Sequence, residues 1–111
     1  MSFDLLDASA AGMSAQRSAL DVAARNMAAA QAAGPKGSYT RLEPVFRVVR
    51  SDDGSDERVE FAGTRADRAT DGDALEEMLA AMNASRAYEA DASLFDVGKR
   101  LAQQTIDMGR L

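Results

Sequence analysis

Large apolar residues stand seven apart in the N-terminal third of the chain, at Leu6, Met13, Leu20 and Met27. Residues between them complete an alternating spacing of three and four, and these are Phe3, Ala10 and Ala24. An apolar period of 3.5 residues over about four heptads is typical of one long helix with a narrow seam. Such a seam packs against other helices, so this chain needs helical partners.

We expect this first helix to run from Phe3 to Ala33, with Ser2 as its N-cap. Gly34-Pro35 ends it, because glycine adopts the left-handed C′ conformation and proline cannot continue a helix. Gly12 weakens the middle of the helix but lets another backbone come close. Arg17 interrupts the seam, and its simplest interpretation is a side chain that reaches into solvent.

The middle of the chain reads as one β-hairpin between polar connections. Tyr39–Arg50 is an extended segment in which Pro44 requires an edge position or a strand that starts after it. Ser51–Asp56 has turn chemistry, and Val59–Phe61 alternates as a short second strand. Gly63–Gly72 is polar and resembles a linker. Because a lone hairpin is barely stable in water, we expect it to lean on a helix or a neighbouring subunit.

A second long helix is predicted from the N-cap Asp73, with Glu76 completing a capping box, to Met108, before Gly109. It carries two apolar stripes. The first comprises Met78, Ala81, Ser85, Tyr88, Ala92, Phe95, Ala102 and Ile106, and the second Leu94, Val97, Leu101 and Met108. Their combined face is wider than the seam of the first helix, which favours contacts with more than one neighbour.

Composition limits both the core and the chemistry of this protein. Alanine supplies much of the 46% hydrophobic content, and a chain of 111 residues without Trp buries little apolar area on its own. A net charge of −5 argues against nucleic-acid binding and against an electrostatic membrane anchor. No apolar stretch is long enough to span a bilayer, and the first residues do not resemble a secretory signal.

Few residues suit catalysis. The chain has no His and no Cys, and it contains no nucleotide-binding or nucleophile motif, so we expect neither an enzyme nor a cofactor or metal site. The acidic group Asp52, Asp53, Asp56 and Glu57 lacks calcium-loop spacing and is better explained as a solvated turn. Tyr88 is the one large side chain among small neighbours. It is either an ordinary core tyrosine or a knob that packs across a subunit boundary.

The two terminal segments resemble the bacterial flagellar basal-body rod proteins, most closely the proximal-rod protein C group. The matching residues are Met1–Asp4, Gly12–Arg17, Glu77–Leu79, Ala84–Ala90 with its S-R-A-Y-E-A motif, Phe95 and Lys99. Weaker matches lie in the middle, at Tyr39–Arg41 and Val59–Gly63. Two segments depart from the family pattern. Asn26 alone remains of its asparagine-rich motif, and Thr64–Gly72 is shorter than the family's corresponding segment.

The resemblance implies a structural subunit of the proximal rod. Family members pair their terminal helices as an antiparallel coiled coil, leave the cytoplasm through the flagellar type III export apparatus without a cleaved signal, and polymerise in the periplasm. The implied partners are the chain itself and other rod proteins, without nucleic acid or direct membrane insertion. The alternative is a relative that acts as a soluble adaptor in export or assembly outside the rod.

Together these arguments predict a mainly α fold with a small β-hairpin, divided into residues 1–34, 35–72 and 73–111. The two terminal parts form the helical rod core, and the middle part holds the hinge, hairpin and linker. The residues assigned to helix packing and assembly are Phe3, Leu6, Met13, Leu20, Met27, Met78, Ser85, Arg86, Tyr88, Glu89, Phe95 and Ile106.

Overall fold

The computed structural model describes residues 2–34, 37–54, 56–67 and 74–109. Its elements are helix α1 (Ser2–Ala33), strand β1 (Arg41–Arg50), strand β2 (Glu57–Asp67) and helix α2 (Ala74–Gly109). The two helices and the two-stranded antiparallel sheet confirm the expected fold class, mainly α with a small hairpin. The molecule is elongated, with principal extents of 68 × 27 × 14 Å.

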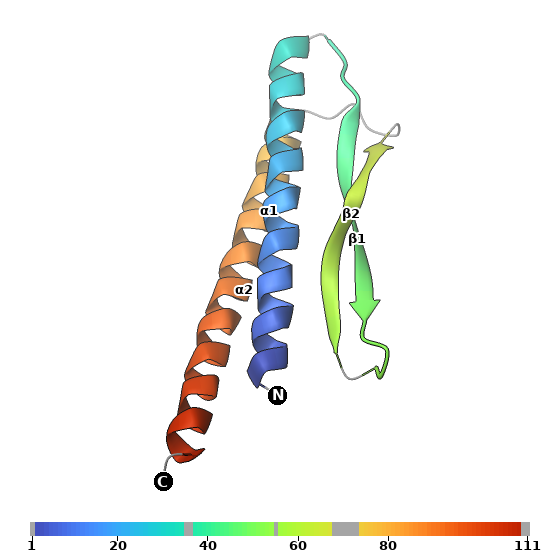
Figure 1. Ribbon diagram of the computed structural model, residues 1–111. Coiled ribbons are helices and arrows are strands. Elements are labelled where there is room, and N and C mark those ends of the chain that lie inside the picture. The colour runs from blue at the N-terminus through green and yellow to red at the C-terminus, as the bar shows by residue number, and fades with distance from the viewer. Residues whose placement is uncertain (1, 35–36, 55, 68–73, 110–111) are drawn as a thin grey trace.

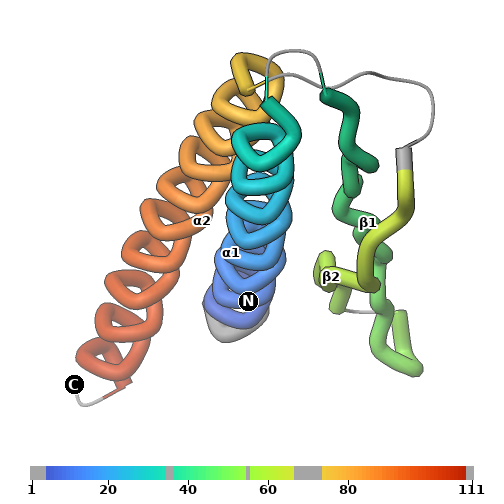
Figure 2. Tube along the Cα trace, turned by 90° about the horizontal axis from the view of Figure 1, so that it is seen from above, coloured from blue at the N-terminus to red at the C-terminus, as the bar shows by residue number. Residues whose placement is uncertain are grey.

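Helix α1 is the middle layer of the molecule, with α2 on one side and the hairpin on the other (Figures 1 and 2). The helices are antiparallel: Leu6 lies against Gly98, and Gly12 lies against Asp91. In Figure 1 the C-terminal end of α2 extends beyond the N-terminal end of α1. Supercoiling of this helix pair remains a prediction.

The helix ends agree closely with the sequence signals. Helix α1 begins one residue earlier than expected and ends at Ala33, and Gly34 follows with a left-handed φ of +75°. The Gly34 N–H donates to the Ala30 carbonyl at 3.2 Å, which satisfies one of the last helical acceptors. Helix α2 begins at Ala74, and the predicted cap Asp73 lies outside the described residues.

The linker prediction for residues 63–72 is wrong at its start, because β2 continues to Asp67. A β-bulge interrupts the pairing of the two strands, and beyond it they pair again as far as Arg41 and Asp67. On β2 the extra residue is Ala62, and Gly63 follows with a φ of +125°, which glycine adopts at little cost. The extension is held by pairing with β1, so local composition alone did not reveal it.

The turn prediction and the edge position of Pro44 are both confirmed. A two-stranded sheet has only edge strands, and Pro44 is tolerated inside β1, where it pairs with Thr64. At the tip, the Gly54 N–H donates to the Ser51 carbonyl at 2.9 Å, and Gly54 has a φ of +71°. The Ser51 hydroxyl donates to Asp53 at 2.6 Å, as expected for a solvated acidic turn.

The core is made of small side chains. Among the described residues, the buried apolar ones are Ala15, Ala19, Val22, Ala23, Ala84 and Ala102. An alanine methyl removes little apolar area from water, so this core contributes little stabilisation for a chain of this length. The expectation that the helices bury little on their own is confirmed.

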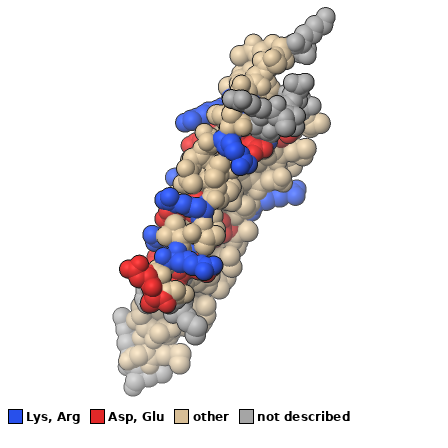
Figure 3. Space-filling model, turned by 90° about the vertical axis from the view of Figure 1, so that its right-hand side faces the viewer, with Lys and Arg blue, Asp and Glu red and all other residues tan. Residues whose placement is uncertain are grey.

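The hairpin leans on its own α1, which answers the question left open by the sequence. The groove between them is lined from β2 by Arg58, Glu60 and Phe61, and the Phe46 and Phe61 rings make an edge-to-face contact at 6.4 Å. The surface seen from the hairpin side shows basic and acidic side chains interspersed (Figure 3). Cross-strand ion pairs account for part of this pattern, among them Arg65–Glu43 at 3.0 Å. The outer face of the hairpin is therefore a solvated one.

Candidate functional site

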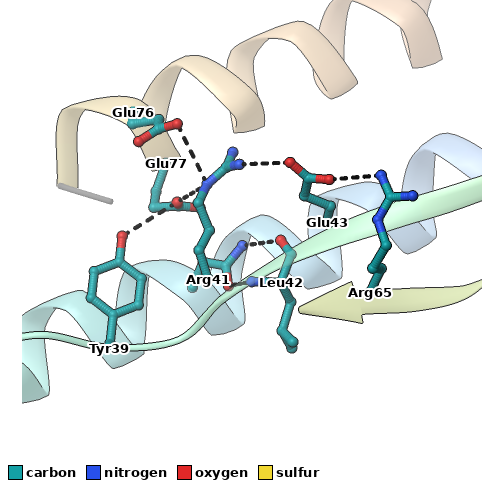
Figure 4. Close-up of polar contacts among 8 residues, drawn as sticks. Tyr39, Arg41, Leu42, Glu43, Arg65, Glu76 and Glu77 are labelled. Carbon is teal, nitrogen blue, oxygen red and sulfur yellow. Dashed lines mark hydrogen bonds and ion pairs between the residues drawn. The ribbon is translucent and has the colours of Figure 1, made fainter. Parts of the chain in front are cut away.

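A polar cluster joins α2 to the hairpin near the start of α2 (Figure 4). The Glu77 side chain is 0% exposed, and its Oε1 accepts a hydrogen bond from Arg41 Nε at 2.6 Å. The Tyr39 hydroxyl donates to the same oxygen at 3.3 Å. Arg41 also lies 3.7 Å from Glu76 and 3.7 Å from Glu43. A carboxyl group buried this deeply is costly to leave without such partners.

Asn26 ties the first residues of β1 to α1 in the same region. Its Nδ2 donates to the Leu42 carbonyl at 2.8 Å, and its Oδ1 accepts from the Leu42 N–H at 2.9 Å. The side chain is buried and satisfies both backbone groups of Leu42, as a neighbouring strand would. Asn26, Arg41 and Glu77 thus connect α1, β1 and α2 at one end of the molecule.

Burial and neighbouring charges shift the pKa of two groups in this cluster, Tyr39 and Arg41. Burial and the adjacent Glu77 carboxylate raise the pKa of the Tyr39 hydroxyl, so the hydroxyl remains a donor. Burial alone lowers the pKa of Arg41, but hydrogen bonding to Glu77 and the charges of Glu77, Glu76 and Glu43 outweigh it, and the pKa is raised. The guanidinium therefore stays charged across the physiological pH range.

Glycines set the distance between the helices. A Cβ atom built on Gly12 would clash with the Asp91 carboxylate. The group that approaches Gly12 is therefore a side chain rather than a backbone. A Cβ on Gly98 would lie 3.1 Å from Leu6 Cδ2. Larger residues at either position force the helices or these side chains apart.

Tyr88 contacts its own α1 through Arg17. The Arg17 guanidinium donates to the Tyr88 hydroxyl at 3.5 Å and lies 6.0 Å from the centre of the ring. Arg17 is exposed, in agreement with the expected solvent-reaching side chain, and Tyr88 is half-buried. The idea that Tyr88 also packs across a subunit boundary remains a prediction.

The predicted assembly residues divide by burial. Half-buried members are Leu6, Met13, Leu20, Met27, Ser85, Tyr88 and Phe95, and exposed members are Met78, Arg86, Glu89 and Ile106. The side chain of Phe3 lies outside the described part. The structure brings Leu6 against α2 at Gly98 and does not bring the exposed members against α1.

Two acidic residues in the seam were missed from the sequence. Glu77 and Asp91 fall on a seven-residue repeat of α2, namely Glu77, Ala84, Asp91 and Gly98, in which Asp91 is half-buried and the other three are buried. The signal was present as spacing, but a search for large apolar residues does not register acids, alanine and glycine. Position in the heptad, rather than hydrophobicity, identifies this face.

The described residues offer neither a metal cluster nor a membrane span. They contain no group of three or more acidic side chains placed to hold a metal ion. Within the same residues, neither helix has an apolar stretch of the length and hydropathy that a bilayer crossing requires. Comparison with protein-family models finds no match, and neither does comparison with curated proteins.

Replacing Asp91 with Asn is expected to stabilise the fold at neutral pH. Burial against α1 raises the pKa of the Asp91 carboxyl above its ordinary value of 3.8, so folding favours the protonated form. The contribution of Asp91 to the free energy of unfolding is greatest below 3.8 and declines as pH rises through the raised value. Urea unfolding across this range measures the effect. Asp96→Asn, the same substitution at an exposed position of α2, is the control.

Proposed function

We propose that this protein is a structural subunit of the bacterial flagellar basal-body rod, in its proximal part, which polymerises through its terminal helices. It reaches the periplasm through the flagellar type III export apparatus without a cleaved signal. Its partners there are further copies and other rod proteins. The chain has no catalytic task in this proposal.

The observation that carries the proposal is the distribution of apolar side chains. The core contains alanines and one valine, while α2 leaves its large apolar residues in solvent: Leu75, Met78, Leu79, Met82, Leu94, Val97, Leu101, Ile106 and Met108. Large apolar side chains left exposed in this number are typical of an interaction surface. Assembly with other helices supplies the burial that one copy lacks.

The polar cluster gives further support. Tyr39, Arg41 and Glu77 belong to the segments that resemble rod proteins, and Asn26 is the asparagine that remains from the family's motif. These residues hold the helices and the hairpin together. The residues behind the resemblance therefore share one structural task, orienting the hairpin on the helix pair.

The direct test is whether the protein is present in purified basal bodies. We expect mass spectrometry and immunogold labelling to place it in the rod, and we expect deletion of its gene to stop rod completion. An adaptor would instead be absent from complete rods and would bind one partner with fixed stoichiometry. Rods that are complete without this protein contradict the proposal.

Tyr88→Ala is expected to impair assembly more than folding. The ring is half-buried against α1, so its loss should lower the free energy of unfolding of the monomer by about 1–2 kcal/mol, less than a fully buried aromatic costs. Sedimentation velocity across a concentration series measures assembly, and dilute thermal melts measure folding. Tyr88→Phe keeps the ring and should assemble normally. Equal losses of folding and assembly would identify Tyr88 as ordinary core.

A further inference from the structure

We infer that the outer face of α2 in one copy docks into the groove between α1 and β2 of a second copy. The inference rests on the proposed assembly function and names the two surfaces that meet. They are different surfaces of the chain, so the contact is heterologous and repeats from copy to copy. Each α1 then lies between its own α2 and the α2 of the neighbour.

The first surface is an exposed apolar stripe of α2 beside the face that contacts α1. It contains Leu94, Val97 and Leu101, each 45–47% exposed, with Arg86 and Arg100 at its edge. Gly98 and Ala102, on the adjoining face of the helix, are buried. The stripe therefore leaves nearly half of each of these side chains exposed in a single copy.

The second surface is an open groove along α1. Its larger part, about 510 Å³, is bounded by Ala10, Ala11 and Ser14 on α1 and by Phe61 on β2. Arg58 and Glu60 of β2 also line it, and they pair with each other at 3.2 Å. A smaller part of about 240 Å³ continues from Ser18 toward the end of β2. A floor of alanine and serine lets a second helix approach closely, and large side chains of a partner fill the space over small ones.

Charge complementarity indicates that the occupant is a second copy. Asp7 and Asp21 line the groove 14 residues apart, and Arg86 and Arg100 flank the stripe 14 residues apart. All four are exposed, and none makes a hydrogen bond or ion pair with the described residues. A separation of 14 residues corresponds to about 21 Å along a helix. Because the two acids and the two bases have the same separation, each acid meets a base when the two helices lie side by side.

The geometry of one copy also sets the orientation of the next. Because α1 and α2 are antiparallel, a neighbour with the same orientation presents its α2 antiparallel to α1. Asp7 then meets Arg100, and Asp21 meets Arg86. Exposed ion pairs contribute little free energy, so these pairs select the register while burial of the stripe stabilises the contact.

Charge reversal tests both surfaces. We expect Arg86→Asp/Arg100→Asp and Asp7→Arg/Asp21→Arg each to raise the concentration needed for assembly about tenfold or more, which corresponds to 1.4 kcal/mol. An equimolar mixture should assemble like the wild type, because the stripe of each variant then matches the groove of the other. Sedimentation velocity at low salt measures assembly, and dilute circular dichroism confirms that each variant folds. Asp52→Arg, in the exposed hairpin turn, is the control and should assemble normally.

Cysteine cross-linking tests the register, since the natural chain has no cysteine. In the antiparallel arrangement Ala10 meets Val97, and a chain carrying both Ala10→Cys and Val97→Cys should form a ladder of disulfide-linked multimers. The control pair Ala10→Cys/Glu89→Cys matches the parallel arrangement and should not cross-link. A disulfide requires Cα atoms within about 7 Å, which makes this readout specific.

Three results would overturn the inference: a wild type that stays monomeric up to about 1 mM (a Kd that corresponds to −4.1 kcal/mol), assembly by either double variant at wild-type concentration, or a mixture that fails to assemble. If only Arg86→Asp/Arg100→Asp loses assembly, the stripes of two copies contact each other. That result also contradicts docking of the stripe into the groove. Detection in basal bodies separates the two proposals. Presence there with any of these results refutes only the docking surfaces, whereas assembly as predicted and absence from rods refutes only the rod function.

Discussion

Replacing Asn26 with Ala is expected to lower the free energy of unfolding by roughly 2–4 kcal/mol. The change leaves the Leu42 N–H and carbonyl without their partners at 2.9 and 2.8 Å. Each buried polar group left unpaired costs about 1–3 kcal/mol, and water reaches this part-buried site only if β1 moves away from α1. Urea unfolding followed by circular dichroism measures the stability, and hydrogen exchange of the Leu42 amide reports the local opening.

Asn83→Ala is the matched control for this change. Asn83 is exposed on α2 and makes no hydrogen bond with the described residues, so its loss should change the stability by less than about 0.5 kcal/mol. If both alanine variants unfold with the same free energy, Asn26 does not anchor the hairpin. Faster exchange at Leu42 with unchanged global stability would show that the hairpin opens separately from the helix pair.

Replacing Glu77 with Ala is expected to destabilise the protein by about 3 kcal/mol. Removing one member of a buried ion pair typically costs 3–5 kcal/mol, because it leaves the other charge uncompensated. Here the loss lies at the lower end, since Arg41 keeps Glu76 and Glu43 within 3.7 Å. Thermal and urea unfolding of the monomer measure the effect, and assembly should weaken as the start of α2 loses its attachment to the hairpin.

Two further variants show whether charge or shape is responsible. Glu76→Ala removes a partly exposed acid 3.7 Å from Arg41 and should cost less than about 1 kcal/mol. The double variant Glu77→Met/Arg41→Met removes both buried charges and should recover most of the stability, since apolar pairs of similar volume replace buried ion pairs well. Equal losses in the single and double variants would show that the contact acts through packing alone.

Asp91 and Glu77 show why the position of α2 in the chain was easier to predict than the residues that form its seam. The capping signal, the helical period and the terminating glycine are local, and they placed α2 within one residue at each end. Burial of an acid depends on distant groups: the partner of Glu77 is Arg41, and Asp91 is covered by α1 at Gly12. A sequence read for apolar periodicity alone places these acids on the solvent side.

The second strand gives the same lesson for the sheet. Gly63–Asp67 looks like a linker because it contains glycine, charge and no β-branched apolar run. It is a strand because β1 lies beside it, with a bulge at Ala62 and an ion pair from Arg65 to Glu43. The turn at Ser51–Gly54, by contrast, was predicted correctly, because its hydrogen bonds join neighbouring residues.

By itself, the sequence determined the long N-terminal helix, its end at Gly34, the C-terminal helix and the hairpin turn, because helix propensity, capping and turn chemistry act over a few residues. Only the tertiary structure decided which residues are buried. The heptad of Leu6, Met13, Leu20 and Met27 lies half-buried, while the core consists of alanines, Val22 and the Asn26 and Glu77 contacts. Burial depends on which helices and strands, far apart in the chain, lie side by side. The two helices approach each other closely at Gly12 and Gly98, and this approach favours small residues in the core.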